Sequence, residues 1–270
     1  MFGKLLKYDF RSMLKQFAFI WPAALVLAVI NRFTLNGLDS SSAVGETTAG
    51  ITMLVYVAIL IAMFVITMIF VIQRFFKGLL GDEGYLMHTL PVRPWELIGS
   101  KLLCAVATTL LSIVVAICSI LFIVPWDGVN WGEVFGGLRY VLSHWNSHAT
   151  HAFFFLLEFL LFLCVGTAQS YLHLYLSMAI GHLFNKNRVA MSVVAYIAIN
   201  AIISALLSFL GAAGFRFGFF DIINNTEFFT SRPEAVIHAT SLTAILSISL
   251  VGAVYFAGTE YILRKKLNLE

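Results

Sequence analysis

Charged residues are scarce in this sequence of 270 residues. Asp, Glu, Lys and Arg together make up 11% of it, whereas 60% of the residues are hydrophobic. A soluble domain carries about 25% charged and about 45–50% apolar residues. This chain therefore lacks the polar side chains that would cover a water-soluble surface. The composition excludes an ordinary soluble enzyme, a nucleic-acid-binding domain and a disordered protein, and it favours a polytopic membrane protein.

Cysteine and proline are also rare, with three and five residues. Cys104, Cys118 and Cys164 lie in long apolar runs, so they predict neither a disulfide framework nor a metal cluster. The few prolines and the 19 glycines leave no room for a Pro/Gly linker, and no internal repeat is visible. We therefore expect one transmembrane domain over residues 1–270.

Sequence motifs of common enzymes are missing as well. The chain has no GxxxxGK[ST] phosphate loop, no HExxH and no GxSxG. We therefore expect no nucleotide site, no resident cofactor and no enzymatic activity in this chain. An intramembrane enzyme would need polar groups that face each other within the bilayer. The best candidates are Ser170, His173 and Tyr175, which have no recognised catalytic spacing.

Six uncharged, mainly apolar runs suggest helices that cross a bilayer, which requires about 20 residues. The first run, Gln16–Asn31, has only 16 residues, but the flanking Lys15 and Arg32 can extend outward to the membrane surface. The runs are too continuous for strands of a barrel, in which polar and apolar residues alternate. We expect an all-α fold with six transmembrane helices. Their expected bounds are about 16–32, 49–74, 101–125, 155–184, 189–213 and 236–260.

The basic residues predict the orientation of these spans. Six spans place both termini on one side, and this side receives 13 of the 17 Lys and Arg residues. Because cytoplasmic loops carry the excess of positive charge, we expect both termini to be cytoplasmic. The 13 residues are Lys4, Lys7, Arg11, Lys15, Arg74, Lys77, Arg93, Lys101, Lys186, Arg188, Arg264, Lys265 and Lys266. The four on the other side are Arg32, Arg139, Arg216 and Arg232.

Residues 2–16 form an amphipathic pattern ahead of the first span. One helical face carries Leu6, Phe10, Met13 and Phe17, and another carries Lys4, Lys7, Arg11 and Lys15. This pattern predicts an interfacial helix that lies in the membrane plane, with its cations facing anionic lipid headgroups.

The segment 77–100 joins spans 2 and 3 and is expected to be cytoplasmic. It carries an acidic pair followed by an apolar ridge, and Pro91 and Pro94 are expected to end a short helix there. This composition fits a helix that docks into the groove of a partner protein. An interfacial hairpin resting on the membrane fits it equally well. The candidate docking residues are Asp82, Glu83, Tyr85, Leu86, Met87 and Leu90.

Two longer loops are expected on the outer side. The segment 125–151 predicts an amphipathic helix on the outer interface, and the aromatic segment 214–234 predicts a re-entrant loop. His144, His148 and His151 have a spacing that can place three imidazoles on one helical face. Polar residues at a membrane boundary are the commoner explanation, so we assign no metal.

Glu158 is a candidate functional acid near the start of span 4. If the helix begins near His151, this carboxyl group lies about two turns inside the helix, where a charge is costly and often functional. If the hydrocarbon begins at Phe159, Glu158 only marks the boundary. The sequence favours the boundary, because the uncharged run after Glu158 is long enough to span a bilayer by itself.

Three stretches of sequence resemble small bacterial (Firmicutes-type) permeases of ABC-2 type transporters. The most specific is Gly81-Asp-Glu-Gly-Tyr-Leu-Met-His-Thr-Leu-Pro-Val92, followed by Trp95-Glu-Leu and Ser100-Lys-Leu. The two ends of the chain, Gly3-Lys-Leu-Leu-Lys-Tyr-Asp-Phe10 and Tyr261-Ile-Leu-Arg-Lys-Lys-Leu-Asn-Leu269, resemble the same group. The order of spans and loops agrees with this family over the whole chain.

The resemblance implies the membrane subunit of an ATP-driven exporter in the bacterial cell membrane. ATP and Mg would be bound by two copies of a separate ATPase subunit, whose groove receives the docking segment. The permease would pair with itself or with a second permease, contact membrane lipids and bind no nucleic acid. Its substrate would be hydrophobic or amphipathic, such as a peptide, lipid or drug. The alternative is a membrane assembly or sensory partner that uses the same docking segment without transport.

Overall fold

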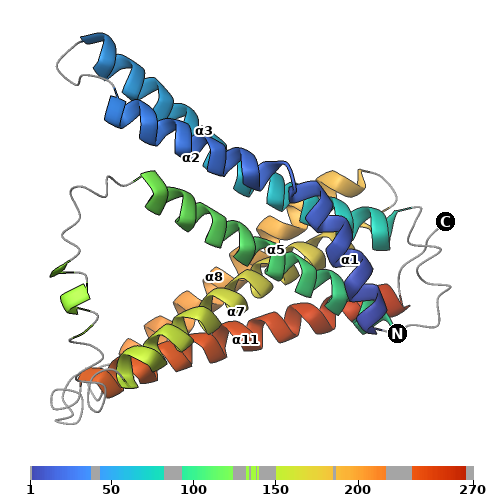
Figure 1. The fold of residues 1–270 in the computed structure, drawn as a ribbon. Helices are drawn as coiled ribbons and strands as arrows, with labels where there is room; N and C mark the ends of the chain where they lie inside the picture. Colours follow the sequence, from blue (N-terminus) through green and yellow to red (C-terminus); the bar gives the residue numbers. More distant parts are fainter. Residues whose placement is uncertain are drawn as a thin grey trace. The chain divides into compact units, whose positions relative to one another are not determined.

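The structure, a computed structural model, describes residues 2–37, 43–81, 93–123, 132–133, 135–137, 139, 150–184, 187–216 and 233–265. These residues form helices and short connections, with no strand among them, as the sequence predicts. The elements are α1 (Phe2–Phe17), α2 (Ile20–Gly37), α3 (Ala43–Phe75), the π-helix η1 (Phe76–Leu80), α5 (Pro94–Ile123), α7 (Thr150–Gly181), α8 (Arg188–Arg216) and α11 (Pro233–Lys265) (Figure 1).

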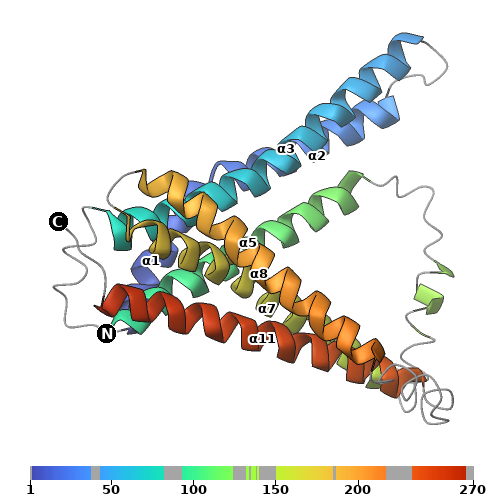
Figure 2. The same ribbon diagram turned by 180° about the vertical axis from the view of Figure 1, so that it is seen from behind.

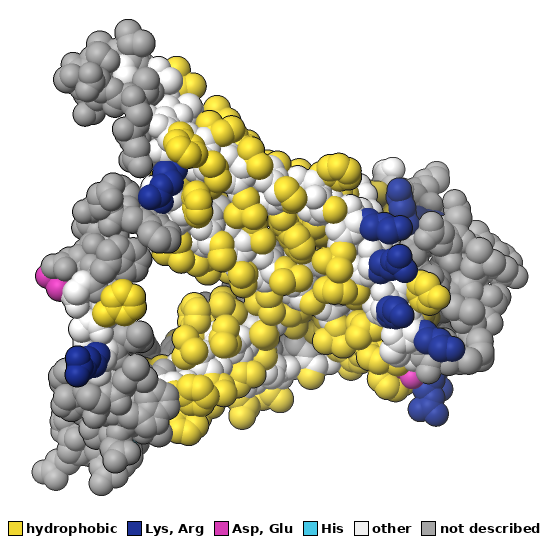
Figure 3. All heavy atoms as spheres, in the orientation of Figure 1, with side chains coloured by type: hydrophobic (Ala, Val, Ile, Leu, Met, Phe, Trp, Pro, Cys, Tyr) yellow, Lys and Arg dark blue, Asp and Glu magenta, His cyan; other side chains and the backbone are white. Residues whose placement is uncertain are grey.

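Six of the described segments are long and apolar enough to cross a membrane, which confirms the expected all-α polytopic class. They are Phe2–Thr34, Gly50–Leu80, Pro94–Ile123, Phe153–Gly181, Arg188–Ala212 and Val236–Lys265. Hydrophobic side chains cover much of the surface of these helices, whereas Lys and Arg side chains gather along α1 (Figure 3). Such an apolar exterior is stable in lipid and would be unstable in water.

Several helix boundaries differ by a few residues from the sequence-based expectation. The third span was expected to begin at residue 101, with Pro94 in the preceding loop, but α5 begins at Pro94 itself. Proline is well suited to the first position of a helix, because its missing N–H would have no intrahelical partner there. The expected amphipathic helix 2–16 agrees with α1, which ends at Phe17, three residues before α2 begins at Ile20.

The helices pack as two compact units. The first unit contains Met1–Phe75 and Glu96–Ser143, and the second contains Phe76–Trp95 and His144–Glu270.

In the first unit, α2 and α3 form a helical hairpin, and α5 packs against it. The apolar core of this contact takes Ala24 from α2, Met63 from α3 and Ala116 from α5. Two hydrogen bonds reinforce it: the Trp21 indole N–H donates to Ser112 over 3.1 Å, and the hydroxyls of Tyr56 and Ser119 lie 2.7 Å apart. Small residues at a contact allow the helix backbones to approach closely in an apolar medium.

Hydroxyl groups on α5 also bond within their own helix. Thr108 donates to the Cys104 carbonyl at 2.9 Å, and Ser119 donates to the Ala116 carbonyl at 2.8 Å. Bonds of this kind satisfy a buried hydroxyl without a partner on another helix. The polar face of α5 therefore combines hydrogen bonds within the helix with hydrogen bonds to Trp21 and Tyr56.

In the second unit, α7 packs between α8 and α11, and the three helices run side by side (Figures 1 and 2). Near the middle of the bundle the His173 ring lies between two tyrosine rings, with centroid distances of 4.2 Å to Tyr196 and 5.1 Å to Tyr255. At the end of α7 the backbone of Gly181 approaches Ser192 so closely that a Cβ on Gly181 would lie 2.0 Å from the Ser192 hydroxyl. Only a glycine fits this contact.

Candidate functional site

Several residues that the sequence singles out lie outside the described part of the structure. They are the docking residues Asp82, Glu83, Tyr85, Leu86, Met87 and Leu90, together with His144 and His148. The structure describes only the elements on either side of the expected docking segment. The π-helix η1 ends at Leu80, and α5 begins at Pro94. Most of the outer segments 125–151 and 214–234 are also outside the described residues, although α8 continues to Arg216.

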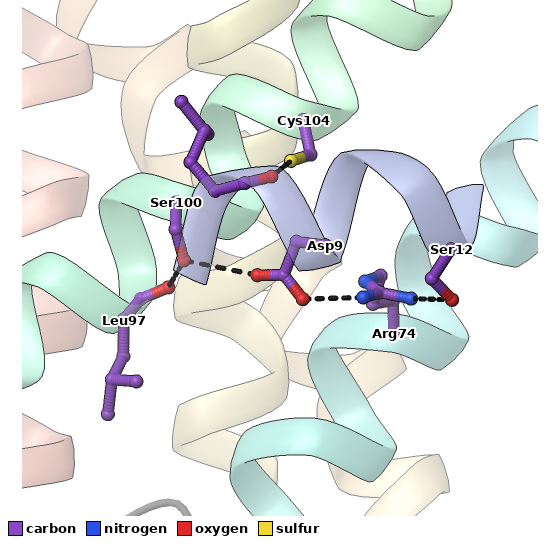
Figure 4. Close-up of polar contacts among 7 residues, drawn as sticks. Asp9, Ser12, Arg74, Leu97, Ser100 and Cys104 are labelled. Atoms are coloured by element: carbon purple, nitrogen blue, oxygen red, sulfur yellow. Dashed lines mark hydrogen bonds and ion pairs between the residues drawn. The ribbon is translucent and has the colours of Figure 1, made fainter. Parts of the chain in front are cut away.

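An ion pair with a buried carboxylate joins three helices of the first unit. Arg74, in the last turn of α3, donates to one carboxylate oxygen of Asp9 at 2.5 Å. The other oxygen of Asp9 accepts a hydrogen bond from the Ser100 hydroxyl at 3.2 Å. A second nitrogen of Arg74 donates to the Ser12 hydroxyl at 2.9 Å. Figure 4 shows these contacts between α1, α3 and α5, and we call them the Asp9 cluster.

The Asp9 cluster also includes a thiol. Cys104 of α5 is 1% exposed, and its Sγ lies 3.7 Å from the Leu6 carbonyl of α1. Asp9 itself is only 6% exposed. A carboxylate at that depth is stable because a cation and a hydroxyl group both bind it. The cluster fixes α1 against the end of α3 and the beginning of α5.

The buried face of α1 differs from the apolar face that the sequence suggests. Asp9, Met13 and Phe17 follow each other at intervals of four residues and are all buried. Residues spaced in this way lie on one side of a helix. The amphipathic sequence pattern places Met13 and Phe17 on this side but gives Asp9 no role. An acid in line with buried apolar residues is the signal that could have identified it.

A second polar cluster lies between α7 and α11. The His238 Nδ1 is 2.8 Å from a carboxylate oxygen of Glu158. The Ser241 hydroxyl donates to the other oxygen of Glu158, and His151 Nδ1 lies 3.3 Å from His238 Nε2. We call these four residues the Glu158 cluster. Phe155 stacks on the His238 ring with a centroid distance of 4.2 Å.

The structure places Glu158 inside a helix. Because α7 begins at Thr150, Glu158 lies about two turns from its first residue, and it falls within the candidate span Phe153–Gly181. The sequence favoured a position at the membrane boundary, beyond which the hydrocarbon would begin at Phe159. Glu158 is 8% exposed and is bound by partners on α11. This is how buried acids in membrane proteins are normally held.

The candidates for an intramembrane enzyme have separate partners. The Ser170 hydroxyl donates to the Gly166 carbonyl of its own helix at 2.9 Å, whereas His173 stacks between two tyrosines. Its Nε2 atom is buried and has no hydrogen-bond partner among the described residues. A hydroxyl nucleophile needs a base within hydrogen-bond reach, and the bond of Ser170 to its own backbone does not provide one.

No family model, curated protein or solved structure matches the chain. What the molecule does must therefore be inferred from its own residues. The Asp9 cluster belongs to the first unit and the Glu158 cluster to the second. Each cluster joins different helices through a buried carboxylate.

Proposed function

We propose that this chain is the membrane-spanning permease subunit of an ATP-driven exporter of ABC-2 type. The sequence between α3 and α5, from Gly81 to Val92, supports the proposal through its resemblance to the docking loop of such permeases. Six membrane-length helices and the absence of a phosphate-loop motif from the sequence agree with a transport subunit that receives its energy from another chain.

The observation that carries the proposal is the position of the Asp9 cluster. Arg74 and Ser100 stand at the two ends of the stretch that contains the docking segment, and both bind the same carboxylate. A permease without an ATP site must receive force through a protein contact and pass it to its spans. A joint that holds α1, α3 and α5 together would make these helices respond as one when a partner moves the segment between them.

The remaining features of the proposal follow from the same resemblance. ATP and Mg are bound by two copies of a partner ATPase, and the permease pairs with itself or with a second permease. The substrate is hydrophobic or amphipathic, of the class of peptides, lipids or drugs, and moves outward across the bacterial cell membrane. Both termini are cytoplasmic, as the distribution of the 17 basic residues predicts.

The test is to damage the docking segment without disturbing the fold. Glu83→Ala combined with Tyr85→Ala removes one charge and one aromatic anchor, and truncations at such contacts cost about 2 kcal/mol or more. We expect loss of co-purification with the partner ATPase, or loss of substrate-stimulated ATP hydrolysis in the reconstituted complex. Unchanged binding together with unchanged stimulation would refute the proposed coupling.

A matched control uses an acid and an aromatic residue from the segment expected on the outer side. Glu133→Ala with Phe135→Ala should leave both ATPase binding and stimulation unchanged, because a cytoplasmic ATPase cannot reach them. An ATPase that binds the wild type but supports no ATP-dependent flux in proteoliposomes would favour the assembly or sensory partner instead.

Orientation can be tested independently. A single cysteine at His88 should resist a membrane-impermeant thiol reagent in intact cells, and one at Ser143 should react. The basis is the division of Lys and Arg into 13 and four. Labelling of the His88→Cys variant from outside would overturn the topology, and with it the cytoplasmic docking segment.

A further inference from the structure

The Glu158 cluster is a continuous chain of hydrogen bonds that connects α7 and α11. The Ser241 hydroxyl donates to one oxygen of Glu158, and the other oxygen lies 2.8 Å from His238 Nδ1. On the opposite side of the ring, His238 Nε2 lies 3.3 Å from Nδ1 of His151. His151 is in the first turn of α7, and Glu158 lies about two turns further along this helix. The chain therefore runs from the end of α7 to a buried carboxylate within the span.

The bond between the two histidines requires a defined number of protons. A carboxylate has no proton to donate, so His238 Nδ1 carries one and donates it to Glu158. His238 Nε2 and His151 Nδ1 can then share one proton, with either atom as the donor. This holds when both rings are neutral and also when they carry one positive charge between them. Two protonated rings would place an N–H against an N–H, and the bond would be lost.

The net charge of the cluster changes with the same proton count. With neutral rings the cluster carries one negative charge, which is costly because Glu158 is 8% exposed and lies within a span. One proton on the histidine pair makes the cluster neutral and keeps its hydrogen bonds. A second proton makes the cluster positive. It also creates two cations whose ring centroids are 5.5 Å apart, where like charges repel each other strongly.

The surroundings of His238 leave few other groups that could compensate its charge. Helix α11 packs against α7, and among the described residues the titratable groups of α7 that face His238 are His151 and Glu158. Phe155 of α7 stacks on the His238 ring with a centroid distance of 4.2 Å and shields that face from water. Within α11, Glu234 precedes His238 by four residues. Histidine is the side chain that ordinarily gains or loses a proton between about pH 5 and 8, so the pair suits a response to pH.

We propose that the Glu158 cluster is a proton-operated latch between α7 and α11. It binds one proton on the histidine pair and stays closed, because this state is neutral and fully hydrogen-bonded. A second proton opens the latch, because the two rings can no longer share a hydrogen bond. Each uptake forms one N–H bond with a proton from water, so no other reactant is required. The division of basic residues predicts that this end of α7 lies on the outer side of the membrane, and the proposal does not depend on a transport function.

Proton uptake can be followed directly on the two histidines. The full-length chain with ¹⁵N-labelled histidine is placed in nanodiscs, and nitrogen NMR spectra are recorded as the pH is lowered from 8 to about 4. The signals of His151 and His238, assigned from variants that lack each one, should show two separate uptakes, because an interacting pair titrates in two steps that belong to the pair. In His151→Gln, His238 should take up its proton in a single step. Two rings that titrate independently of each other would overturn the proposal.

A change at Glu158 tests why the first proton binds. Glu158→Gln keeps the shape of the side chain but removes its charge, so one bound proton leaves the cluster positive instead of neutral. The proton affinity of the first uptake should therefore fall about tenfold or more. Glu260→Gln is the matched control, because it removes an acid near the other end of α11, and it should leave both uptakes unchanged. A first uptake that is the same in Glu158→Gln and the wild type would contradict the role of the carboxylate.

Opening of the latch can be measured as a distance between the two helices. In a chain without its native cysteines, spin labels at Phe154→Cys of α7 and Ile237→Cys of α11 report this distance, since both side chains are exposed and lie outside the cluster. The distance should stay constant through the first uptake and increase at the second. In a labelled His238→Gln variant it should not change over the same pH range. A distance that is constant through both uptakes, or that increases equally in His238→Gln, would show that the histidine pair does not hold α7 and α11 together.

Discussion

Replacing Asp9 by Asn should loosen α1 from α3 and α5. The side chain keeps its shape but loses the charge that binds Arg74 at 2.5 Å. The buried Nε atom of Arg74 already has no hydrogen-bond partner among the described residues. Breaking a fully buried ion pair costs about 3–5 kcal/mol. The Arg74 side chain is 22% exposed, so water offsets part of the loss. We therefore expect about 2 kcal/mol, within the range for hydrogen bonds to charged groups.

Cys104 provides the assay, because it is buried beside Leu6 of α1. Cys118 is exposed and Cys164 partly exposed, so both are first replaced by Ser. A thiol reagent then reaches Cys104 only when the contact between α1 and α5 opens, and the labelling rate follows the open population. A loss of about 2 kcal/mol corresponds to labelling about 30-fold faster.

Lys7→Ala is the matched control, because it removes an exposed charge from the same helix. Exposed charges contribute little to stability, so this variant should label at the rate of its cysteine-reduced parent. An Asp9→Asn variant that remains folded and is labelled as slowly as its cysteine-reduced parent would show that the ion pair does not hold α1 in place. The mechanical role proposed for the Asp9 cluster would then be wrong.

Two further predictions concern the second unit. Gly181→Ala should lower the thermal midpoint in detergent, because the new Cβ would lie 2.6 Å from the backbone nitrogen of Ser192. Such overpacking lowers the free energy of unfolding by about 1–3 kcal/mol. Gly166→Ala in the same helix, where nothing lies within 4 Å, should not lower the midpoint, and equal effects of the two changes would contradict this reasoning. His182 has a lowered pKa because of burial and the nearby positive charge of Arg188. The unfolded chain therefore binds a proton at this histidine at a higher pH than the folded chain does. As a result, the free energy of unfolding should fall as the pH drops below about 6.5. His182→Gln should reduce this dependence of the thermal midpoint between pH 8 and pH 5, and an unchanged pH dependence would contradict the assignment.

The helices could be predicted from the sequence because the signal for them is local. A run such as Ala49–Gln73 contains no charge, and its length alone indicates a helix that can cross a bilayer. Helix ends were harder to predict. Pro94 was expected to stiffen a loop, yet it begins α5, because a proline both disfavours the preceding helix and suits the first turn of the next.

The polar clusters could be predicted only in part. Glu158 was identified as a candidate because an acid near an apolar run is unusual, but its partner His238 lies 80 residues away and no local pattern connects them. Asp9 was overlooked because the basic residues of α1 dominate its charge pattern. Its partner Arg74 was counted only as part of the charge bias, since 65 residues separate the two. Pairings between distant helices depend on packing, which a single sequence does not reveal.

The internal hydrogen bonds of α5 have a consequence for motion. Thr108 bonds to its own helix and would keep that bond if α5 slid along α2 and α3. Trp21 now donates to Ser112, which lies four residues after Thr108. A slide by four residues, about 6 Å, would bring the Thr108 hydroxyl close to the place where the Ser112 hydroxyl now lies. The Trp21 indole would thus find a hydroxyl in either register, whereas Tyr56 would lose Ser119, so the second hydrogen bond is the one that selects the observed register of α5.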